Sequence, residues 1–474
     1  MVFSSITFLS AFLVVVFLLH MIVPNMHVKN GLLILASLLF YAVGEPVYVL
    51  LMIASSILNY VMGRWIGKAK KTKNLKKSKI ILVVSVVINV GLLVVFKYTN
   101  FLIGVLNTIP SVAIPEVDIA LPIGISFFTF QAMSYVIDVY REDCDYQKNY
   151  FKVLLYISFF PQLIAGPIVK YKDIEEEVSN RRQTVEDIEA GIRRFIMGLS
   201  KKDLISHALA QMVDQLMPSL GNHGVAAWLP AIGYTLQIYY DFSGYSDMAI
   251  GLGWMFGFHF KENFDHPYDS LSIKEFWRKW HISLSTWFKE YVYIPLGGNR
   301  KGRVRTVVNK YIVFFLTGLW HGANFTFILW GLIHGTCSVL EENKKFSINK
   351  ISLGFVRYII TMLVVICAFV LFRADTVGQG LTMLGQMFGG HANAYGTMLT
   401  LAQFTPYTIF AFAAGLLFMF PWVDGLRKKI AVKQNGALTA SIHVCTGILL
   451  IVCLLFCMIQ LASDAYNPFI YFRF

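Results

Sequence analysis

The chain has 474 residues, of which 56% are hydrophobic and only 15% are charged, and its mean hydropathy is +0.59. Soluble domains carry about one quarter charged residues, so this composition excludes a soluble protein, a disordered chain and a disulfide-rich secreted fold. The net charge is +13. In a chain of long apolar runs this excess indicates basic cytoplasmic loops and not nucleic-acid binding. We therefore expect an all-α polytopic membrane protein.

Apolar runs long enough to cross a bilayer, about 20 residues each, recur along the whole chain. They predict single spans at residues 3–23, 80–96, 121–140, 355–372, 404–423 and 437–461. Three longer stretches predict pairs of helices, and these are 31–64 with a turn at 44–46, 226–258 with a break at 241–244, and 308–340 with a break at 321–324. A short stretch with two prolines, 151–168, predicts a re-entrant segment. In total we expect about eleven or twelve spans plus re-entrant or amphipathic helices.

Charge predicts the orientation of these spans. Residues 64–79 carry eight lysines and arginines and no acid, and residues 427–433 carry a second basic cluster, so both should be cytoplasmic loops. One span follows the second loop, and no basic residue precedes Lys29. We therefore expect both termini on the external side of the cytoplasmic membrane. Thr184 to Asp187 predicts the start of an amphipathic helix with acids in its first turn.

Polar residues at membrane depth are costly, which makes them functional candidates. Gln131, Ser134, Asp138 and Arg141 share one helical face, which can form interhelical hydrogen bonds or line a chamber. Farther on, Asp241, Ser243 and Asp247 interrupt an apolar stretch, either as a helix cap or as a polar chamber wall.

The sharpest single feature is His321, which stands beside Trp320 and near Asn324 with glycines on both sides. Small glycines admit another group close to the imidazole, which favours function over simple packing. On one continuous helix His334 would lie about 20 Å from His321, so we expect it to be a packing residue. His281 is the best partner for His321, and we expect it beside a helical stripe of aromatic residues that begins at Ile273.

A basic, glycine-rich turn follows that stripe. Such a turn can approach an anionic group through backbone N–H groups and cationic side chains, although topology alone also accounts for its charge. The candidates for binding an anionic donor are Arg278, Lys289, Gly297, Gly298, Arg300, Lys301 and Arg303. The six cysteines form no CxxC pair, and no histidine spacing indicates a metal site, so we expect no metal.

Five segments carry a resemblance to a known family. They read LPIGISFFTFQAMSYVIDVY at 121–140, FFPQLIAGPIVKYK at 159–172, GYTLQIYYDFSGYSDMAIG at 233–251, FWRKWHISLSTWFKEYVYIPLGGNR at 276–300 and TGLWHGANFTFILWGLIHG at 317–335. With them the chain resembles the membrane-bound O-acyltransferase superfamily, and within it the alginate O-acetylase branch. The tail, 469–474, is similar as well.

The resemblance implies one many-helix membrane domain, 1–474, with a tunnel through the bilayer. It divides into N-terminal helices at 1–120, a catalytic core at 121–340 and C-terminal helices at 341–474. It also implies that His321 is the essential histidine and His281 the second one. The donor would be cytoplasmic acetyl-CoA, bound as a substrate with no resident cofactor. The acceptor would be a hydroxyl of an extracytoplasmic surface polysaccharide, reached through a partner protein with a serine-hydrolase-like domain.

Acyl transfer from a thioester to a hydroxyl needs a base and a group that stabilises the oxyanion. His321 can act as the base, or form an acyl-histidine, with His281 orienting it or stabilising the oxyanion. Two alternatives remain at this stage. One is a D-alanyl transferase of the teichoic-acid type that uses a carrier-protein thioester, and the other is a non-enzymatic transporter or export scaffold.

Overall fold

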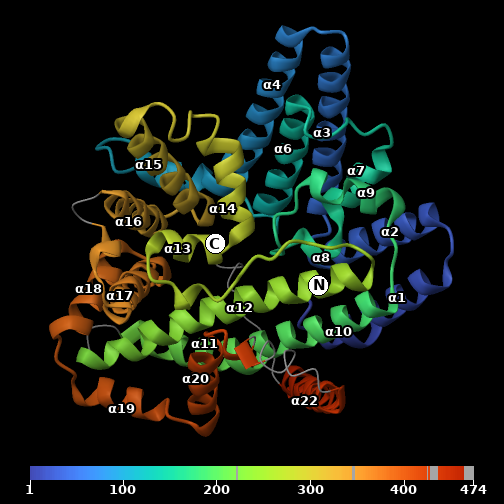
Figure 1. Ribbon diagram of the computed structural model, residues 1–474. Coiled ribbons are helices and arrows are strands. Elements are labelled where there is room, and N and C mark those ends of the chain that lie inside the picture. The colour runs from blue at the N-terminus through green and yellow to red at the C-terminus, as the bar shows by residue number, and fades with distance from the viewer. Residues whose placement is uncertain (220–222, 344–346, 424, 427–435, 464–474) are drawn as a thin grey trace. The chain divides into compact units, whose positions relative to one another are not determined.

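The computed structural model describes residues 1–219, 223–343, 347–423, 425–426 and 436–463. Within these residues every regular element is a helix, which confirms the all-α prediction (Figure 1). Packing divides the chain into two compact units. The N-terminal unit comprises Met1–Phe195 and Met248–Lys261, and the C-terminal unit comprises Ile196–Asp247 and Glu262–Phe474. This division does not test the predicted single domain, which stays a prediction.

The N-terminal unit consists of apolar helices joined mostly by short turns. In chain order its helices are η1 (Phe8–Phe12), α1 (Leu13–Ile22), α2 (Met26–Gly44), α3 (Tyr48–Lys71), α4 (Leu75–Leu93), η2 (Val94–Tyr98), α5 (Thr99–Leu106), α6 (Ile125–Arg141), α7 (Tyr150–Ser158), α8 (Phe160–Leu163), α9 (Tyr171–Asn180) and most of α10 (Val185–Ser200).

The C-terminal unit contains all of the histidine motifs. Its helices are η3 (Lys201–Ser206), α11 (His207–Leu216), η4 (Met217–Ser219), η5 (Gly224–Ala227), most of α12 (Trp228–Met255), η6 (Pro267–Asp269), α13 (Ile273–Lys279), α14 (Ile282–Phe288), η7 (Lys289–Tyr293), α15 (Gly302–His321), α16 (Phe325–Glu342), η8 (Ile348–Lys350), α17 (Gly354–Arg373), α18 (Val377–Gly389), α19 (Ala394–Ala402), α20 (Pro406–Phe418) and α22 (Gly436–Ser463).

Five helices among the described residues are long and apolar enough to cross a membrane, or six if the bent pair α19 and α20 is one span. This number is smaller than the expected eleven or twelve, because several apolar segments form short or broken helices, such as α1, α7 and α8. The basic segment 427–433 and the tail 469–474 lie outside the described residues. The side of the membrane on which each terminus lies stays a prediction.

Most of the predicted breaks are confirmed. The turn at 44–46 separates α2 from α3, and the glycine-rich motif after His321 separates α15 from α16. Residues 151–168 form two short helices, α7 and α8, as their prolines predict. At the start of α10 the Thr184 hydroxyl accepts a hydrogen bond from the backbone N–H of Asp187, at 3.1 Å. This is the cap that the local sequence predicts.

The predicted break at 241–244 is wrong. Residues Trp228–Met255 form one continuous helix, α12. Asp241 does not cap a helix, because Lys202 Nζ donates to its Oδ1 at 2.6 Å. Gly244 does not end the helix either. A Cβ there would come within 2.6 Å of the backbone oxygen of Gly198, so the glycine permits close packing against the end of α10.

The aromatic stripe that starts at Ile273 is not one helix, which corrects a second expectation. Helix α13 ends at Lys279 and α14 starts at Ile282. Between them His281 has a φ of +44°, in the left-handed region that residues other than glycine rarely adopt. This strained residue turns the chain between α13 and α14. His281 therefore does not continue the helical face that starts at Ile273.

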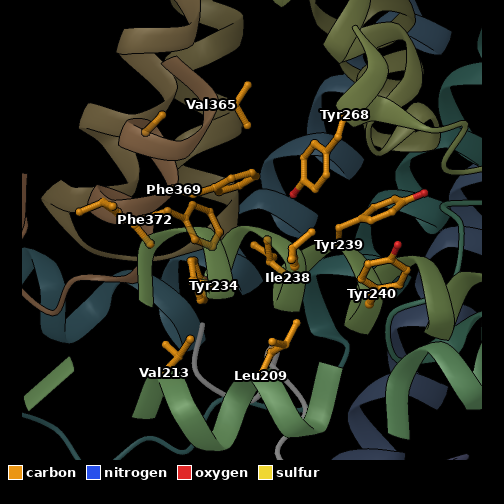
Figure 2. Packing of buried hydrophobic residues seen from close by; sticks show 14 of the residues in the cluster. Leu209, Val213, Tyr234, Ile238, Tyr239, Tyr240, Tyr268, Val365, Phe369 and Phe372 are labelled. Carbon is orange, nitrogen blue, oxygen red and sulfur yellow. The ribbon is translucent and has the colours of Figure 1, made fainter. Parts of the chain in front are cut away.

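Aromatic residues of α12 and α17 form the core of the C-terminal unit. Figure 2 shows Tyr234 and Ile238 of α12 between Leu209 of α11 and Phe369 of α17. The rings of Tyr234 and Phe369 have centroids 6.5 Å apart and meet edge to face, a favourable arrangement. Tyr268 extends this core, and its hydroxyl donates to the backbone oxygen of Thr235 at 2.5 Å.

A buried ion pair joins η3 to α12 within this unit. The side chains of Lys202 and Asp241 are only 5% and 3% exposed. Next to it, Lys201 and Asp247 form a second pair at 2.6 Å that is 32% and 14% exposed. Removing one partner of a buried pair leaves an uncompensated charge. At a partly exposed pair the loss is smaller, because water can solvate the remaining charge.

We expect Asp241→Asn to lower the free energy of unfolding by about 3–5 kcal/mol. The double variant Lys202→Met/Asp241→Leu should regain most of this loss, because it removes both charges. Asp247→Asn is the matched control and should cost at most about 1 kcal/mol. Thermal unfolding in detergent, followed by circular dichroism, measures the difference. Equal midpoints for Asp241→Asn and Asp247→Asn would contradict the assignment.

Candidate active site

The position of His321 follows from the glycines around it. His321 is the last residue of α15, and Gly322 ends the helix. A Cβ on Gly318 would collide with the backbone of Phe327 in α16, and a Cβ on Gly322 would collide with the Phe327 ring. Glycine at both places therefore lets α15 and α16 pack side by side (Figure 1), with the chain turning back directly after the histidine.

Three aromatic rings surround the His321 imidazole, and we call them the aromatic enclosure. The ring centroids of Trp320, Trp330 and Phe372 lie 5.0, 5.1 and 5.2 Å from that of His321. They come from α15, α16 and α17. His321 itself is 5% exposed. The enclosure keeps the imidazole away from bulk water.

The structure brings His281 to the same place. Its imidazole is fully buried, and its centroid lies 6.4 Å from that of His321. It also packs edge to face against Trp320, at 5.8 Å, and against Phe242, at 4.5 Å. The pairing of the two histidines that the sequence predicts is therefore seen in the fold, although α14, η7 and the basic turn separate them along the chain.

Asn263 is a site residue that the sequence reasoning missed. It is fully buried, and its Oδ1 lies 3.2 Å from His281 Nδ1. The same Oδ1 accepts from the backbone N–H of Ser283 at 3.1 Å and from its hydroxyl at 2.8 Å. Asn263 Nδ2 donates to Ser246 Oγ at 3.0 Å. No local pattern marks this asparagine, because all of these partners lie on other elements.

Burial lowers the pKa of His281 well below its ordinary value of 6.5, and the neighbouring His321 lowers that pKa further. His281 is therefore neutral at physiological pH. Its Nε2 has no hydrogen-bond partner among the described residues. A buried imidazole with an unused nitrogen next to a second histidine is suited to proton transfer with a bound molecule.

His334 lies closer to His321 than a continuous helix would allow. Because α15 and α16 form a hairpin, the Trp330 ring is 5.1 Å from both imidazoles, so these are no more than twice that distance apart. His334 also stacks on Phe276 at 5.8 Å. The expected separation was wrong, but the expected packing role agrees with these ring contacts.

The other predicted chamber residues occupy varied positions. Ser243 is buried on α12, next to the ion-paired Asp241, and Asp247 pairs with Lys201. Asn324 caps α16 by accepting from the N–H of Thr326, and it donates to the backbone oxygen of Asp375 at 2.8 Å. Gln131 is buried in α6 of the N-terminal unit. A chamber role for these residues stays a prediction.

The predicted donor-binding residues include five exposed cations and the glycines of one turn. Glycines shape the turn, because Gly297 and Gly298 have φ values of +106° and +55°. The cationic side chains are solvent-exposed, and they are Arg278, Lys289, Arg300, Lys301 and Arg303. We call Arg300, Lys301 and Arg303 the basic loop. Among the residues that the structure describes, no group of three or more His, Cys, Asp or Glu side chains is placed to hold a metal ion.

Comparisons with known proteins identify the family of the chain. Residues 145–384 match the membrane-bound O-acyltransferase family, and this range includes both histidines, Asn263 and the aromatic enclosure. The chain is 37% identical to "Probable alginate O-acetylase AlgI" of Pseudomonas putida, over the whole length of both chains. It is 34% identical to "Peptidoglycan O-acetyltransferase" of Helicobacter pylori, over 82% of this chain and 80% of that one.

A more distant similarity involves a different acyl group. The chain is 29% identical to "Teichoic acid D-alanyltransferase" of Bacillus subtilis, but over only 47% of this chain and 61% of that one.

Proposed function

The chain belongs to the membrane-bound O-acyltransferase family, and we propose that it moves acetyl groups from cytoplasmic acetyl-CoA to hydroxyls of an extracytoplasmic polysaccharide. The family and the alginate O-acetylase-like resemblance predicted by the motifs are confirmed. The chain is thus a multi-pass membrane enzyme that catalyses O-acyl transfer, and the alternative of a non-enzymatic scaffold is set aside. We place it in the bacterial cytoplasmic membrane.

One observation supports the reaction site above all others. Two buried imidazoles lie 6.4 Å apart, centroid to centroid, beside an aromatic enclosure. Transfer of an acyl group to a hydroxyl requires a group that takes the hydroxyl proton and a group that stabilises the developing oxyanion. Two neighbouring imidazoles can divide these roles. General-base catalysis of this kind contributes about 10² to 10⁴ in rate.

The aromatic enclosure supports a small acyl group. Trp330 and Phe372 are themselves in contact, with centroids 5.0 Å apart, and Phe327 packs on Phe372 at 4.7 Å. Such packing leaves room beside His321 for a two-carbon group more readily than for a fatty acyl chain. The two O-acetylating relatives, which match most of the chain, agree with acetyl as the transferred group.

The basic loop supports a donor that carries phosphates. Its three exposed cations follow a glycine-rich turn and stand at the start of α15, the helix that ends at His321. A helix N-terminus and cationic side chains both favour anions. Coenzyme A carries phosphate groups, which these cations can bind. A carrier-protein thioester remains the alternative donor, since a D-alanyltransferase is among the relatives.

The acceptor is assigned by class only. The relatives named for alginate and for peptidoglycan indicate a surface glycan for this chain as well. We propose that a partner with a serine-hydrolase-like domain receives the acetyl group outside the membrane and passes it to the polysaccharide. Membrane lipid surrounds the spans.

We expect His321→Ala to abolish acetyl transfer while the protein still folds, because the variant loses the imidazole at the reaction site. The measurement uses enzyme in liposomes, together with the extracytoplasmic partner and the acceptor polysaccharide, and radiolabelled acetyl-CoA. It follows the labelled polysaccharide and the released CoA thiol. His391→Ala, which changes an exposed histidine, is the matched control and should keep full activity.

Near-normal acetyl transfer by His321→Ala, at an equal protein level, would contradict the assignment of the active site. Label that moves only from a D-alanyl carrier protein, and never from acetyl-CoA, would instead replace the proposed donor.

We expect Phe372→Leu and Phe372→Ala to widen the range of acyl groups. Removing ring volume beside His321 should raise the ratio of kcat/KM for butyryl-CoA to kcat/KM for acetyl-CoA by about 10-fold or more. This is the discrimination that an apolar pocket achieves for one to two extra methylene groups. Competition between the two donors measures this ratio. Phe355→Ala is the control on the same helix, because Phe355 is 73% exposed. An unchanged ratio in both Phe372 variants would refute a size limit at this wall.

We expect the triple variant Arg300→Glu/Lys301→Glu/Arg303→Glu to raise the KM for acetyl-CoA by about 10-fold, from three exposed charge contacts of up to about 1 kcal/mol each. The KM for S-acetyl-N-acetylcysteamine, an acetyl thioester without phosphates, should stay the same. Lys350→Glu, at an exposed lysine outside the basic loop, serves as the control. Equal increases in KM for both donors would argue against phosphate binding by the basic loop.

A further inference from the structure

Asn263 is held in one orientation by contacts at both ends of its amide. The backbone N–H of Ser283 can only donate, so the atom that it meets at 3.1 Å must be the amide oxygen. The amide nitrogen then donates to Ser246 Oγ at 3.0 Å. The Asn263 backbone is held too, since its carbonyl accepts from the N–H of Ile282 at 2.9 Å. The amide oxygen is therefore the atom that faces His281.

This oxygen determines which nitrogen of His281 carries the proton. Asn263 Oδ1 has no hydrogen to donate, and it lies 3.2 Å from His281 Nδ1. An unprotonated Nδ1 would place two lone pairs against each other at this distance in a buried site. A proton on Nδ1 instead makes a hydrogen bond. In the neutral imidazole the lone pair is then on Nε2, which has no partner among the described residues.

We propose that Asn263 is a positioning residue that holds His281 in the Nδ1–H tautomer, so that His281 Nε2 is the proton acceptor of the acyl transfer. The inference rests on the proposed function. From the sequence, His281 could either orient His321 or stabilise the oxyanion. An unprotonated Nε2 cannot donate a hydrogen bond to an oxyanion, so this tautomer excludes the second role for Nε2. In this division of roles His321 stabilises the carbonyl oxygen through a ring N–H.

The proton and electron balance of the step is simple. The acceptor hydroxyl gives its proton to His281 Nε2 while its oxygen bonds to the carbonyl carbon of the acetyl thioester. When the tetrahedral intermediate collapses, the carbon–sulfur bond breaks and the sulfur leaves with the bonding pair. The imidazolium of His281 returns the proton to this sulfur. The products are an acetate ester and a free thiol, and His281 is neutral again.

The strained backbone of His281 favours a functional role for this arrangement. Its φ of +44° costs energy that the surroundings must offset. The segment that contains Asn263 supplies hydrogen bonds on both sides of the break, from Asp265 N–H to the Lys279 carbonyl at 2.9 Å and from Ile282 N–H to the Asn263 carbonyl. Residues 263–265 therefore stabilise the turn at His281, and Asn263 also fixes which ring nitrogen carries the proton.

Two variants of Asn263 and one control test the proposal. Asn263→Ala removes the acceptor of the Nδ1 proton and should lower kcat by about 10² or more, with the KM for acetyl-CoA changed by less than about 3-fold, since a misplaced imidazole proton affects the transition state. Asn263→Asp keeps an acceptor at the same place but adds a negative charge, which stabilises the imidazolium. It should stay active and move the acid limb of the kcat/KM pH profile to higher pH.

Ser246→Ala is the matched control. It removes the hydrogen bond at the far end of Asn263, which Asn263→Asp changes from an amide donor to a carboxylate acceptor, but it leaves Oδ1 against His281. Its pH profile should superimpose on that of the wild type. Among the described residues, His321 is the other titratable group whose charge affects the pKa of His281, and it is present in all three variants.

Three outcomes overturn the proposal. They are an Asn263→Ala variant with a kcat within about 3-fold of wild type, an Asn263→Asp variant with a wild-type pH profile, and an Asn263→Asp variant that folds but is inactive. If Asn263→Ala does not fold, the near-isosteric Asn263→Asp decides alone. Because these assays compare active enzymes, failure here leaves O-acetyl transfer itself standing. Failure of the proposed function shows separately, as a wild-type chain that does not use acetyl-CoA.

Discussion

Two interruptions of helices, one at His281 and one at Gly322, place both imidazoles beside the Trp320 ring. A helix break in apolar surroundings exposes backbone groups that must find other partners. At the first break Asn263 supplies them, through its own carbonyl and through its side-chain oxygen. At the second, the Asn324 side chain accepts from the N–H of Thr326. The candidate active site therefore depends on local hydrogen bonds that make both breaks tolerable.

Charged residues are scarce in this chain, and the buried charges of Lys202 and Asp241 are paired with each other. Lys202 and Asp241 neutralise each other between η3 and α12, which lets a carboxylate lie inside an unbroken helix. Around His321 and His281 the neighbours are mainly aromatic rings instead. An environment from which water is excluded strengthens electrostatic interactions within it. The C-terminal unit thus contains both a buried ion pair, Lys202 with Asp241, and a site with two imidazoles among aromatic rings.

Much of the architecture can be predicted from local patterns, and the errors have one cause. The breaks at Gly44 to Pro46 and after His321 follow from glycine and proline, whose effects are local. The false break at Asp241 came from reading polar residues as the end of an apolar run. Its partner Lys202 lies on another element. The break at His281 was missed for the converse reason, since the residues that stabilise it begin at Asn263.

The sequence by itself determined the class of protein, its all-helical character and the motifs that contain the two histidines, because composition, apolar runs and motif residues are properties of neighbouring positions. Only the tertiary structure decided that Phe372 and Trp330 enclose His321, that Lys202 neutralises Asp241, and that Asn263 meets His281. These pairs belong to different helices and loops. A helical pattern indicates which face of a helix is buried, but the residue that meets this face is set by how the helices pack.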